Sequence, residues 1–449
     1  MSDYFNEITE KVKELVRINS VEAPALPGKP FGEGVAEALH YMLELGKSLG
    51  FKTTNYDNYV GEIEWGEGEK TLGILCHVDV VPAGKTEAWK HPPFSATEED
   101  GKIYGRGTMD DKAPAVICLY AMKTLMDEGF VPKQKIKLIL GCDEESGWQC
   151  MAHYKKVAKM PDYGFSPDGS FPVIYAEKGI LHLKFDFFTN SFLSIIKGGE
   201  RPNMVCDECY AYAPIPYHAE SFRMTLADGK KQNYILPVSK LLVRQFGLDV
   251  RADGTVKATG KSAHGSTPEK GENAILTILK YLEGVGAVGP EIREIFFDDA
   301  LGLTKLHDET GYLTMCPGII DKGEFDKFIS LTVDIRYPAS LKKEEVLDKF
   351  IRNGIKYTVL EHQPPLYVKK NDPLIKTLLG VYNEVTGRTS RPIAIGGGTY
   401  ARALPLGVAF GPEPEDEEAT VHEPNEYISL KCIKETYGIY TEAIKKLTE

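Results

Sequence analysis

The sequence predicts an α/β protein in which a central, mostly parallel β-sheet flanked by helices is interrupted by an inserted α+β domain. Three observations lead to this prediction. Helix and strand signals alternate through roughly the first 180 residues, half-buried strand patterns appear after Ile180, and the first pattern returns after Pro364-Pro365. We therefore assign residues 1–179 and 367–449 to one domain and residues 180–366 to the insertion.

The first sheet is predicted from two strands and two helices. Apolar residues at helical spacing cover residues 35–49, and a second helix over 113–128 is closed by Gly129. Residues 71–76 form a continuous apolar run, which is typical of a strand buried on both faces, and residues 135–140 form the next strand. Strands that alternate with helices pair in parallel, and ligands of such sheets gather beyond the carboxyl ends of the strands.

The remaining elements follow from the same signals. Half-buried strands of the insertion are predicted at 181–187, 222–226, 256–259 and 330–335, and helices at 273–282 and 342–351. The C-terminal part returns to the α/β pattern, with helices at 374–384 and 428–447 and short buried strands at 392–395 and 407–410. The insertion is expected to be a layered unit with one solvent-facing side.

Composition restricts the partners and the compartment. A net charge of −12 argues against nucleic acid, whose phosphates require a basic face, and no run of ~20 apolar residues could span a membrane. Residues 1–13 are polar and indicate an amphipathic helix instead of a secretory signal, so we expect a cytoplasmic protein. The eight cysteines, including the pair Cys206 and Cys209, are expected to be free thiols. No second C-x-x-C supports a zinc site or redox pair.

Five separate clusters of potential metal ligands lie where predicted strands end and loops begin. They are His77-Val78-Asp79, Asp110-Asp111, Glu144-Glu145, Asp168 and His422. Nitrogen and carboxylate ligands of this kind suit a divalent transition metal. Their number exceeds what one tetrahedral ion needs, which indicates two ions about 3.5–4 Å apart that share a carboxylate and activate a water. Hydrolysis is therefore the leading hypothesis.

Each cluster alone has a simpler interpretation. Asp110 precedes a helix and could act as its N-cap, and Glu144 and Glu145 could be an acidic helix start favoured by the helix dipole. Alternatively, one of these adjacent glutamates binds a cation while the other acts as general base. Asp168 lies in an ordinary turn sequence and His422 in an ordinary loop. A nucleotide-binding loop at 105–110 is excluded, because Asp110 stands where the third glycine belongs.

Taken together, six segments resemble the dinuclear metallopeptidase family that includes acetylornithine deacetylase, succinyl-diaminopimelate desuccinylase and dipeptidase V. The resemblance covers essentially the whole chain and rests on Cys76-His-Val-Asp79, Gly105-Arg-Gly-Thr-Met-Asp-Asp-Lys112, Asp143-Glu-Glu-Ser-Gly147, Ser166-Pro-Asp168, Ser262-Ala-His264-Gly and His422-Glu-Pro-Asn-Glu-Tyr-Ile. It implies a zinc-peptidase-like catalytic domain interrupted by a lid domain, and it reverses the simpler interpretations given above.

The resemblance also implies a role for each site residue. Asp110 would bridge two divalent ions, Zn²⁺ or Mn²⁺ with Co²⁺ as a further possibility; His77 and Asp168 would complete one ion's shell, and Glu145 and His422 the other's. Asp79 would orient His77, and Glu144 would act as the general base. His264 of the lid would polarise the substrate carbonyl or hold the oxyanion. The family often has a cis peptide at the position of Asp110-Asp111.

Within the family, the chain resembles most the dipeptidase V branch. By that resemblance the insertion is nearly twice the usual lid length and permits a monomer. Asn203 would enter the site, and Arg336 would grip the substrate's terminal carboxylate, a task that suits a bidentate guanidinium. Gly397 and Thr399 lie in a glycine-rich segment whose backbone amides could share that anion. One departure is Ala113-Pro114 after Lys112, where the family commonly has glycine.

We therefore expect a metallo-dipeptidase that cleaves unblocked dipeptides, β-alanyl ones among the candidates, by a hydroxide held between two ions. Two alternatives stay open. The first is an N-acyl amino acid deacylase of the same family. The second is a catalytically inactive protein that binds a small molecule, although the presence of Glu144, Asp79 and His264 argues against it.

Overall fold

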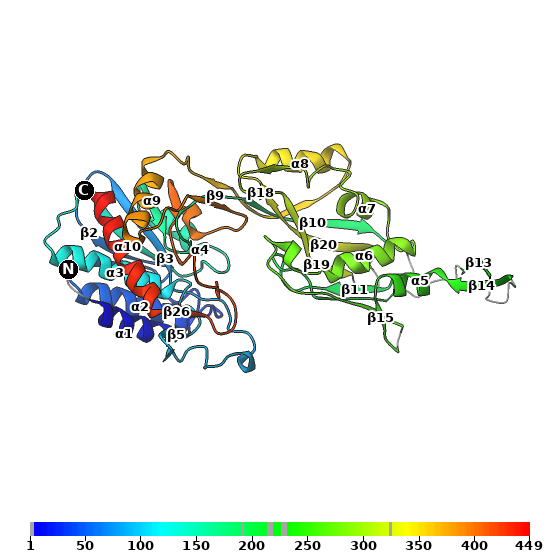
Figure 1. The fold of residues 1–449 in the computed structure, drawn as a ribbon, viewed down its shortest axis with the longest axis horizontal. Helices are drawn as coiled ribbons and strands as arrows, with labels where there is room; N and C mark the ends of the chain where they lie inside the picture. Colours follow the sequence, from blue (N-terminus) through cyan, green and yellow to red (C-terminus); the bar gives the residue numbers. More distant parts are fainter. Residues whose placement is uncertain (1–3, 191–192, 213–218, 226–230, 253, 323–325) are drawn as a thin grey trace. The chain divides into compact units, whose positions relative to one another are not determined.

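The computed structural model describes residues 4–190, 193–212, 219–225, 231–252, 254–322 and 326–449, and side chains within 213–239 are not described. The chain folds into two compact units. The first unit contains Met1–Ala176, Leu366–Ala394 and Thr399–Glu449, and the second contains Glu177–Pro365 and Ile395–Gly398. The chain therefore leaves the first unit twice, for a long insertion and for the short segment Ile395–Gly398, and both termini belong to the first unit (Figure 1).

A nine-stranded mixed sheet forms the centre of the first unit. In spatial order its strands are β1 (Lys52–Tyr56), β2 (Val60–Trp65), β6 (Lys135–Gly141), β3 (Thr71–His77), β7 (Tyr163–Ser166), β24 (Gly407–Ala409), β9 (Ile174–Glu177) and β22 (Leu366–Tyr367), and β23 (Ile393–Ile395) pairs with β9. The four central strands β6, β3, β7 and β24 are parallel, and this confirms the predicted α/β class. The edge hairpin of β1 and β2 is antiparallel, with Asp57 and Asn58 at positive φ in its tight turn.

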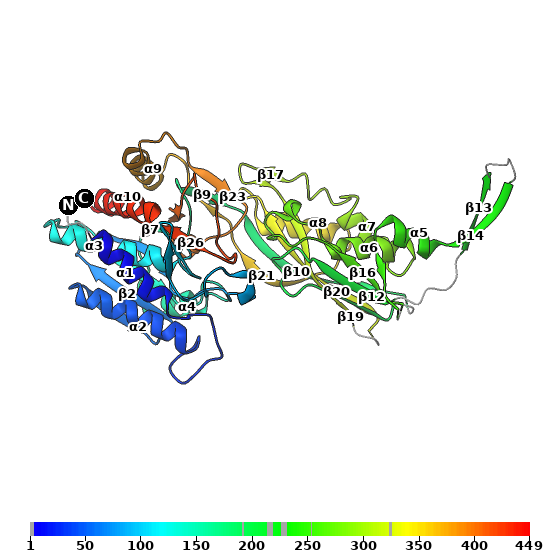
Figure 2. The ribbon, with the colours of Figure 1, turned by 60° about the horizontal axis from the view of Figure 1, so that its bottom comes forward.

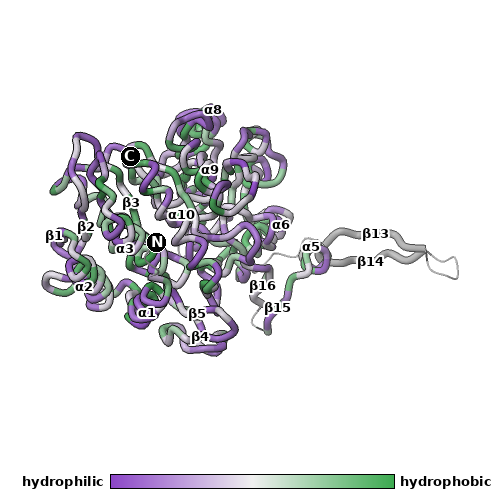
Figure 3. Tube along the Cα trace, turned by 60° about the vertical axis from the view of Figure 1, so that its left-hand side comes forward, coloured by the Kyte–Doolittle hydropathy of each residue, from purple (hydrophilic) through white to green (hydrophobic). Residues whose placement is uncertain are grey.

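Helices cover both faces of this sheet. They are α1 (Phe5–Val16), α2 (Glu33–Ser48), α3 (Lys112–Asp127), α4 (Gln149–Val157), α9 (Pro373–Thr386) and α10 (Leu430–Thr448). On β2, Gly61 and Ile63 face α2, whereas Glu62 between them bonds Tyr154 of α4 on the opposite face. Apolar and polar residues alternate along α2, as the changing colours of its trace show (Figure 3). Its buried residues, such as Leu39 and Met42, follow helical spacing.

The parallel strands bring several of the predicted ligands to one edge of the sheet. Strand β3 ends at His77, β6 ends at Gly141 just before Glu144, and β7 ends at Ser166 just before Asp168. The N–H of Val78 donates to the carbonyl of Gly141 at 3.0 Å, so the chain ends of β3 and β6 stay in register. Because carboxyl ends of parallel strands meet at the same edge, residues far apart in the sequence become neighbours there.

The second unit is an α+β layer built on an antiparallel sheet. In spatial order its strands are β15 (Asp249–Val250), β16 (Val256–Thr259), β12 (Glu208–Tyr212), β11 (Ile195–Gly198), β19 (Thr314–Lys322), β20 (Phe328–Tyr337), β10 (Gly179–Phe188) and β21 (Thr358–Gln363). Helices α5 (Val238–Gln245), α6 (Ala274–Gly284), α7 (Glu291–Phe296) and α8 (Lys343–Arg352) accompany it (Figure 2). Along β10, Leu183 and Phe185 join the buried core with α6, α7 and α8, whereas Lys184 and Asp186 lie on the other side.

The smaller sheets and the remaining details complete the fold. They comprise β4 (Thr97–Glu99), β5 (Lys102–Tyr104) and β26 (Tyr427–Ser429), then β8 (Gly169–Ser170) with β25 (Pro412–Glu413), β17 (His307–Asp308) with β18 (Gly311–Tyr312), and β13 (Ala219–Thr225) with β14 (Lys231–Pro237). Strand β13 covers most of the strand predicted at 222–226; Leu226 itself lies outside the described residues.

All eight cysteines are buried free thiols, as expected. Over the described ranges, no helix is both long and apolar enough to cross a membrane.

Candidate metal centre

Two groups of potential ligands lie in the first unit. His77, Glu144 and Asp168 form one group, and Asp110, Glu145 and His422 form the other; within each group the ligand atoms lie within 4.8 Å of one another. All six residues had been predicted as metal ligands or, for Glu144, as the general base. Their positions in the sequence span 77 to 422, so the fold has brought five separate segments together.

Asp110 belongs to the second group and also contacts His77 of the first. Its Oδ1 is 2.8 Å from Nε2 of His77, and its Oδ2 is 2.9 Å from Nε2 of His422. Nε2 of His77 is also 4.0 Å from Asp168 Oδ1, and Nε2 of His422 is 3.1 Å from Glu145 Oε1. Each carboxylate oxygen of Asp110 therefore faces a different imidazole, which is the geometry required of a carboxylate that bridges two ions.

The electrostatics of these residues call for cations. Burial raises the pKa of Glu144 well above its usual range, and the negative charge of Asp168 adds to this effect. Burial and the charge of Asp110 raise the pKa of Asp168 to about 7 and also raise the pKa of Glu145. Four carboxyl groups and two imidazoles so close together fit two divalent ions, which would neutralise the concentrated negative charge.

Asp79 holds both His77 and the loop that carries Glu145. The ring Nδ1 of His77 is 3.0 Å from the main-chain carbonyl of Asp79 and 3.6 Å from its carboxylate Oδ1. The second carboxylate oxygen of Asp79 accepts the N–H of Glu145 at 3.0 Å. A proton on Nδ1 that donates to this carbonyl leaves Nε2 as the nitrogen that faces Asp110, the tautomer that a metal ligand needs.

The helix-cap interpretation of Asp110 and the helix-start interpretation of Glu144 and Glu145 are wrong. Helix α3 begins at Lys112, and its N-cap residue is Asp111, whose side chain makes no capping bond. Instead, Oδ2 of Asp111 accepts the main-chain N–H of His77 at 3.1 Å. Helix α4 begins only at Gln149, so Glu144 and Glu145 belong to the preceding turn and not to a helix start. The peptide bond Asp110-Asp111 is cis, as the family resemblance implied.

Tyr400 supports the site, although its sequence gives no signal of this. Its main-chain N–H donates to Asp168 Oδ2 at 3.2 Å, and its ring meets the ring of His77 edge to face at 6.0 Å. The buried hydroxyl is 3.1 Å from Sγ of Cys150 and lies against Gly141, where a Cβ would overlap it. Tyr400 therefore contacts both His77 and Asp168, and only a glycine fits at position 141 beside its hydroxyl.

In the second unit, the segments that carry Asn203, His264 and Arg336 lie next to one another. The N–H of Gly265, next to His264, donates to the carbonyl of Asn203 at 2.7 Å. A Cβ at Gly265 would lie 2.6 Å from Oδ2 of Asp334, so this segment also packs against the partner of Arg336. Arg336 is buried and donates from Nε and Nη2 to both oxygens of Asp334. Gly397 belongs to the second unit and Thr399 to the first.

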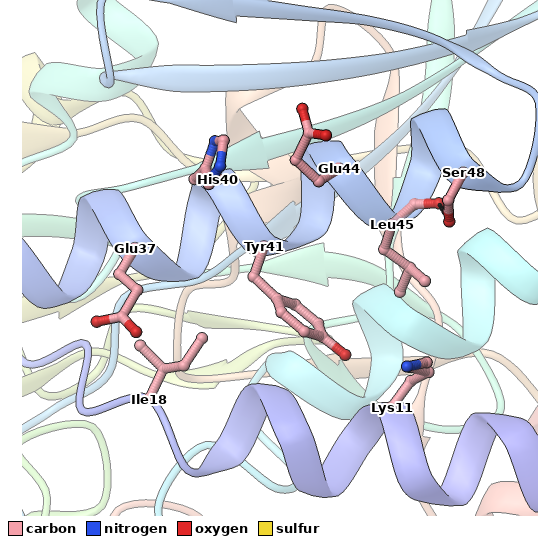
Figure 4. Close-up of a pocket in the computed structure, with 8 residues that line it drawn as sticks. All are labelled: Lys11, Ile18, Glu37, His40, Tyr41, Glu44, Leu45 and Ser48. Atoms are coloured by element: carbon pink, nitrogen blue, oxygen red, sulfur yellow. Dashed lines mark hydrogen bonds between the residues drawn. The ribbon is translucent and has the colours of Figure 1, made fainter.

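A separate groove lies on the first unit between α1 and α2 (Figure 4). Its lining residues are Lys11, Ile18, Glu37, His40, Tyr41, Glu44, Leu45 and Ser48. Tyr41 points from α2 toward α1, and its hydroxyl donates to Glu14 at 2.7 Å. The predicted site residues lie on other elements, so we regard the groove as a feature of helix packing.

An α/β sheet that gathers imidazoles and carboxylates in two adjoining groups at its carboxyl edge is typical of metal-dependent hydrolases. Residues 73–446 match the model of peptidase family M20/M25/M40, and the chain belongs to this family of peptidases. A protein of Bacillus subtilis (strain 168) named "Putative dipeptidase YtjP" is 35% identical to it, with 99% of this chain and 97% of the relative covered.

Solved structures show the same fold. The M20 family metallo-carboxypeptidase Sso-CP2 from Sulfolobus solfataricus superposes with a TM-score of 0.58 at 18% identity, covering 98% of each chain. Human carnosine dipeptidase 1 superposes with a TM-score of 0.59 at 16% identity, covering 99% of this chain and 96% of that one. At such identities the likeness concerns the fold, and the function must be argued from the residues of the site.

Proposed function

We propose that the protein is a dipeptidase that hydrolyses unblocked dipeptides at a centre of two divalent ions. The observation that carries the proposal is Asp110, whose two carboxylate oxygens face His77 and His422 on opposite sides. The dipeptidase names of the Bacillus subtilis relative and of the human structural neighbour point the same way. The long insertion favours a monomer, and we place the protein in the cytoplasm.

The residues of the first unit divide the chemistry among them. Two bound ions, whether Zn²⁺, Mn²⁺ or Co²⁺, would lower the pKa of a water and polarise the scissile carbonyl. His77 and Asp168 would hold one ion, Glu145 and His422 the other, and Asp110 both. Glu144 lies within 4.8 Å of the ligand atoms of His77 and Asp168. From there its carboxylate takes a proton from the attacking water and returns it to the departing amine.

His264 of the second unit, acting as a lid, would stabilise the oxyanion. The main-chain N–H of Ser266 is 3.2 Å from Nδ1 of His264 and can only donate, so this nitrogen accepts. A neutral imidazole that accepts at Nδ1 carries its hydrogen on Nε2. That N–H is the donor that a developing negative charge on the carbonyl oxygen requires.

Arg336 would recognise the terminal carboxylate of the substrate. Asp334 binds Nε and Nη2 of the guanidinium at 2.8–3.0 Å, so the arginine is held in one orientation. The Nη1 edge lies outside this pair and can donate to a carboxylate. Asn203 and the segment with Gly397 and Thr399 would complete the substrate contacts. Recognition of a free carboxylate at one end and a free amine at the other would define the dipeptide.

A substrate panel tests the proposal against its closest alternative, an N-acyl amino acid deacylase. Purified protein with its metal content measured is assayed on a free dipeptide, a β-alanyl dipeptide and the N-acetyl form of the same C-terminal amino acid. We expect kcat/KM to be at least about 100-fold higher on a free dipeptide than on the N-acetyl amino acid. Preference for the N-acetyl amino acid would establish the deacylase instead. Binding of these compounds without turnover would indicate an inactive binding protein.

Arg336→Lys should raise KM for free dipeptides by about 10- to 100-fold, because an ammonium cannot reproduce the planar two-point contact. The lysine keeps a positive charge beside the buried Asp334, so the second unit should remain folded. The measurement is kcat/KM on a dipeptide and on its C-terminal amide. The amide should lose little from the substitution, and an equal loss on both compounds would contradict the carboxylate contact.

A further inference from the structure

A buried ion pair joins the two loops that carry Asp110 and His422. Nη1 of Arg106 is 2.6 Å from Oε2 of Glu426, and the two side chains are 2% and 0% exposed. Arg106 lies four residues before Asp110, and Glu426 lies four residues after His422. Asp110 and His422 belong to the same ligand group. The ion pair therefore joins the two loops that carry them, although Arg106 and Glu426 are 320 residues apart in the sequence.

Glu426 organises the loop of Asp110 through backbone amides. Its Oε1 accepts the N–H groups of Gly107 at 3.0 Å, Met109 at 2.9 Å and Asp110 at 3.4 Å. Its own carbonyl accepts the N–H of Gly105 at 2.9 Å. The carboxylate therefore fixes the backbone from Gly107 to Asp110, and the main-chain carbonyl of Glu426 fixes the backbone just before Arg106.

Arg106 organises the loop of His422 in the reciprocal way. Its Nη2 donates to the carbonyl of His422 at 3.3 Å, and its Nη1 is 3.5 Å from the carbonyl of Glu423. The guanidinium also stacks over the ring of Trp89, 5.3 Å from its centre. His422 has a φ of +64°, a left-handed conformation that a residue with a side chain keeps only when its surroundings impose it.

We propose that Arg106 and Glu426 are positioning residues that set the spacing between Asp110 and His422 and hence the affinity of the second ligand group for its ion. A buried ion pair usually adds little net stability compared with apolar residues of similar size, so its hydrogen bonds to both ligand loops are the better explanation for it. This inference rests on the proposed metal centre. Outer residues that orient metal ligands commonly change metal affinity by about 10- to 100-fold.

The test is a titration of the metal-free full chain with Co²⁺, followed by visible absorption and by competition with a chelator. Glu426→Gln keeps the shape but places an amide NH₂ against the guanidinium or against the loop amides. We expect the Co²⁺ site of the second ligand group, Asp110, Glu145 and His422, to lose about 10- to 100-fold in affinity, and the amide hydrogens of Gly107 and Met109 to exchange faster. The wild type should take up two Co²⁺ per chain.

A matched control comes from a second buried pair of the first unit, Lys137 and Glu62, which are 2.8 Å apart on strands β6 and β2. Glu62→Gln removes a comparable charge, and its partners are Lys137 and Tyr154 instead of the ligand loops. We expect unchanged Co²⁺ affinity in this variant. The double variant Arg106→Met with Glu426→Met leaves no unpaired charge, but it removes the acceptor of the Gly107, Met109 and Asp110 N–H groups, so its Co²⁺ affinity should be reduced as in Glu426→Gln.

The outcomes distinguish failure of the positioning role from failure of the metal centre. Wild-type Co²⁺ affinity in both Glu426→Gln and the double variant would overturn the positioning role and leave the metal centre standing. A wild-type chain that takes up no Co²⁺ would overturn the metal centre and the positioning role with it. An affinity loss in Glu62→Gln as large as in Glu426→Gln would show a general effect of stability, and it would also overturn the specific role of the pair.

Discussion

Replacing Glu144 by glutamine should lower kcat on a free dipeptide by about 10²- to 10⁴-fold, the usual contribution of a general base. The amide has nearly the same shape as the carboxylate but cannot take a proton from the attacking water. Metal content should change little, because His77, Asp110, Glu145, Asp168 and His422 remain. The measurements are kcat on the best dipeptide of the panel and the metal content of the same sample by elemental analysis.

Glu418→Gln is the matched control. Glu418 is an exposed acid of the first unit, and its replacement removes one charge without changing the two ligand groups. Its kcat should equal that of the wild type. If Glu144→Gln retained normal turnover, Glu144 would not be the base. If the variant lost its metal as well as its activity, Glu144 would act as a ligand of the group that it shares with His77 and Asp168.

Removing the metal with a chelator should abolish dipeptide hydrolysis and make the stability of the protein depend on pH. Ions that bind only the folded chain at 100 times their Kd contribute about 2.7 kcal/mol to the free energy of unfolding. Their removal also leaves the carboxylates of the two groups facing one another. Activity should return when Zn²⁺, Mn²⁺ or Co²⁺ is added back, and residual activity in a fully metal-free sample would contradict the proposed chemistry.

The direction of the pH effect follows from the pKa shifts. Burial and the charge of Asp110 raise the pKa of Asp168 to about 7, and the pKa values of Glu144 and Glu145 are raised too. Folded metal-free protein then holds more protons than the unfolded chain, so its stability falls as pH rises from about 4 to about 7. The slope can reach about 1.4 kcal/mol per pH unit for each such group.

Asp110 acts in the opposite direction. The imidazoles of His77 and His422 hold its pKa below the usual range despite its burial, so its contribution is lost as pH falls below about 4. Urea unfolding of metal-free protein at pH 5 and pH 7.5 measures the net effect, and the metal-loaded protein is the control. We expect greater metal-free stability at pH 5, and a much smaller difference with metal bound. Equal metal-free stability at both pH values would contradict the shifts.

Much of the fold could be predicted because its elements are local. The strand expected at 71–76 is β3 (Thr71–His77), the helix expected at 113–128 is α3 (Lys112–Asp127), and the closing helix at 428–447 is α10 (Leu430–Thr448). Their signals are apolar periodicity, a continuous buried run and a glycine that ends a helix, all of which lie within a few residues. The hairpin of β1 and β2 was missed, since its strands mix polar and apolar residues at a sheet edge.

The candidate ligand residues could be named from sequence for a related reason. Residues that follow parallel strands must meet at one edge, so His77, Glu144 and Glu145, which follow predicted strands, could be named as candidates from sequence. The roles expected of Asp110, Asp168 and His422 needed the family resemblance, because a loop aspartate or histidine has common structural roles. Apart from what the resemblance implied, the sequence could not show how the six residues divide into groups, which depends on distances of a few ångströms between side chains.

By itself, then, the sequence determined the class of fold, the segments that bear ligands and the family. Only the tertiary structure revealed what holds those candidate ligands in place. Tyr400 bonds Asp168 across 232 residues, and Arg106 bonds Glu426 across 320. Such contacts arise from the packing of distant segments and leave no periodic trace along the chain. A tyrosine, an arginine and a glutamate in loops acquire their roles only when the sheet edge assembles around them.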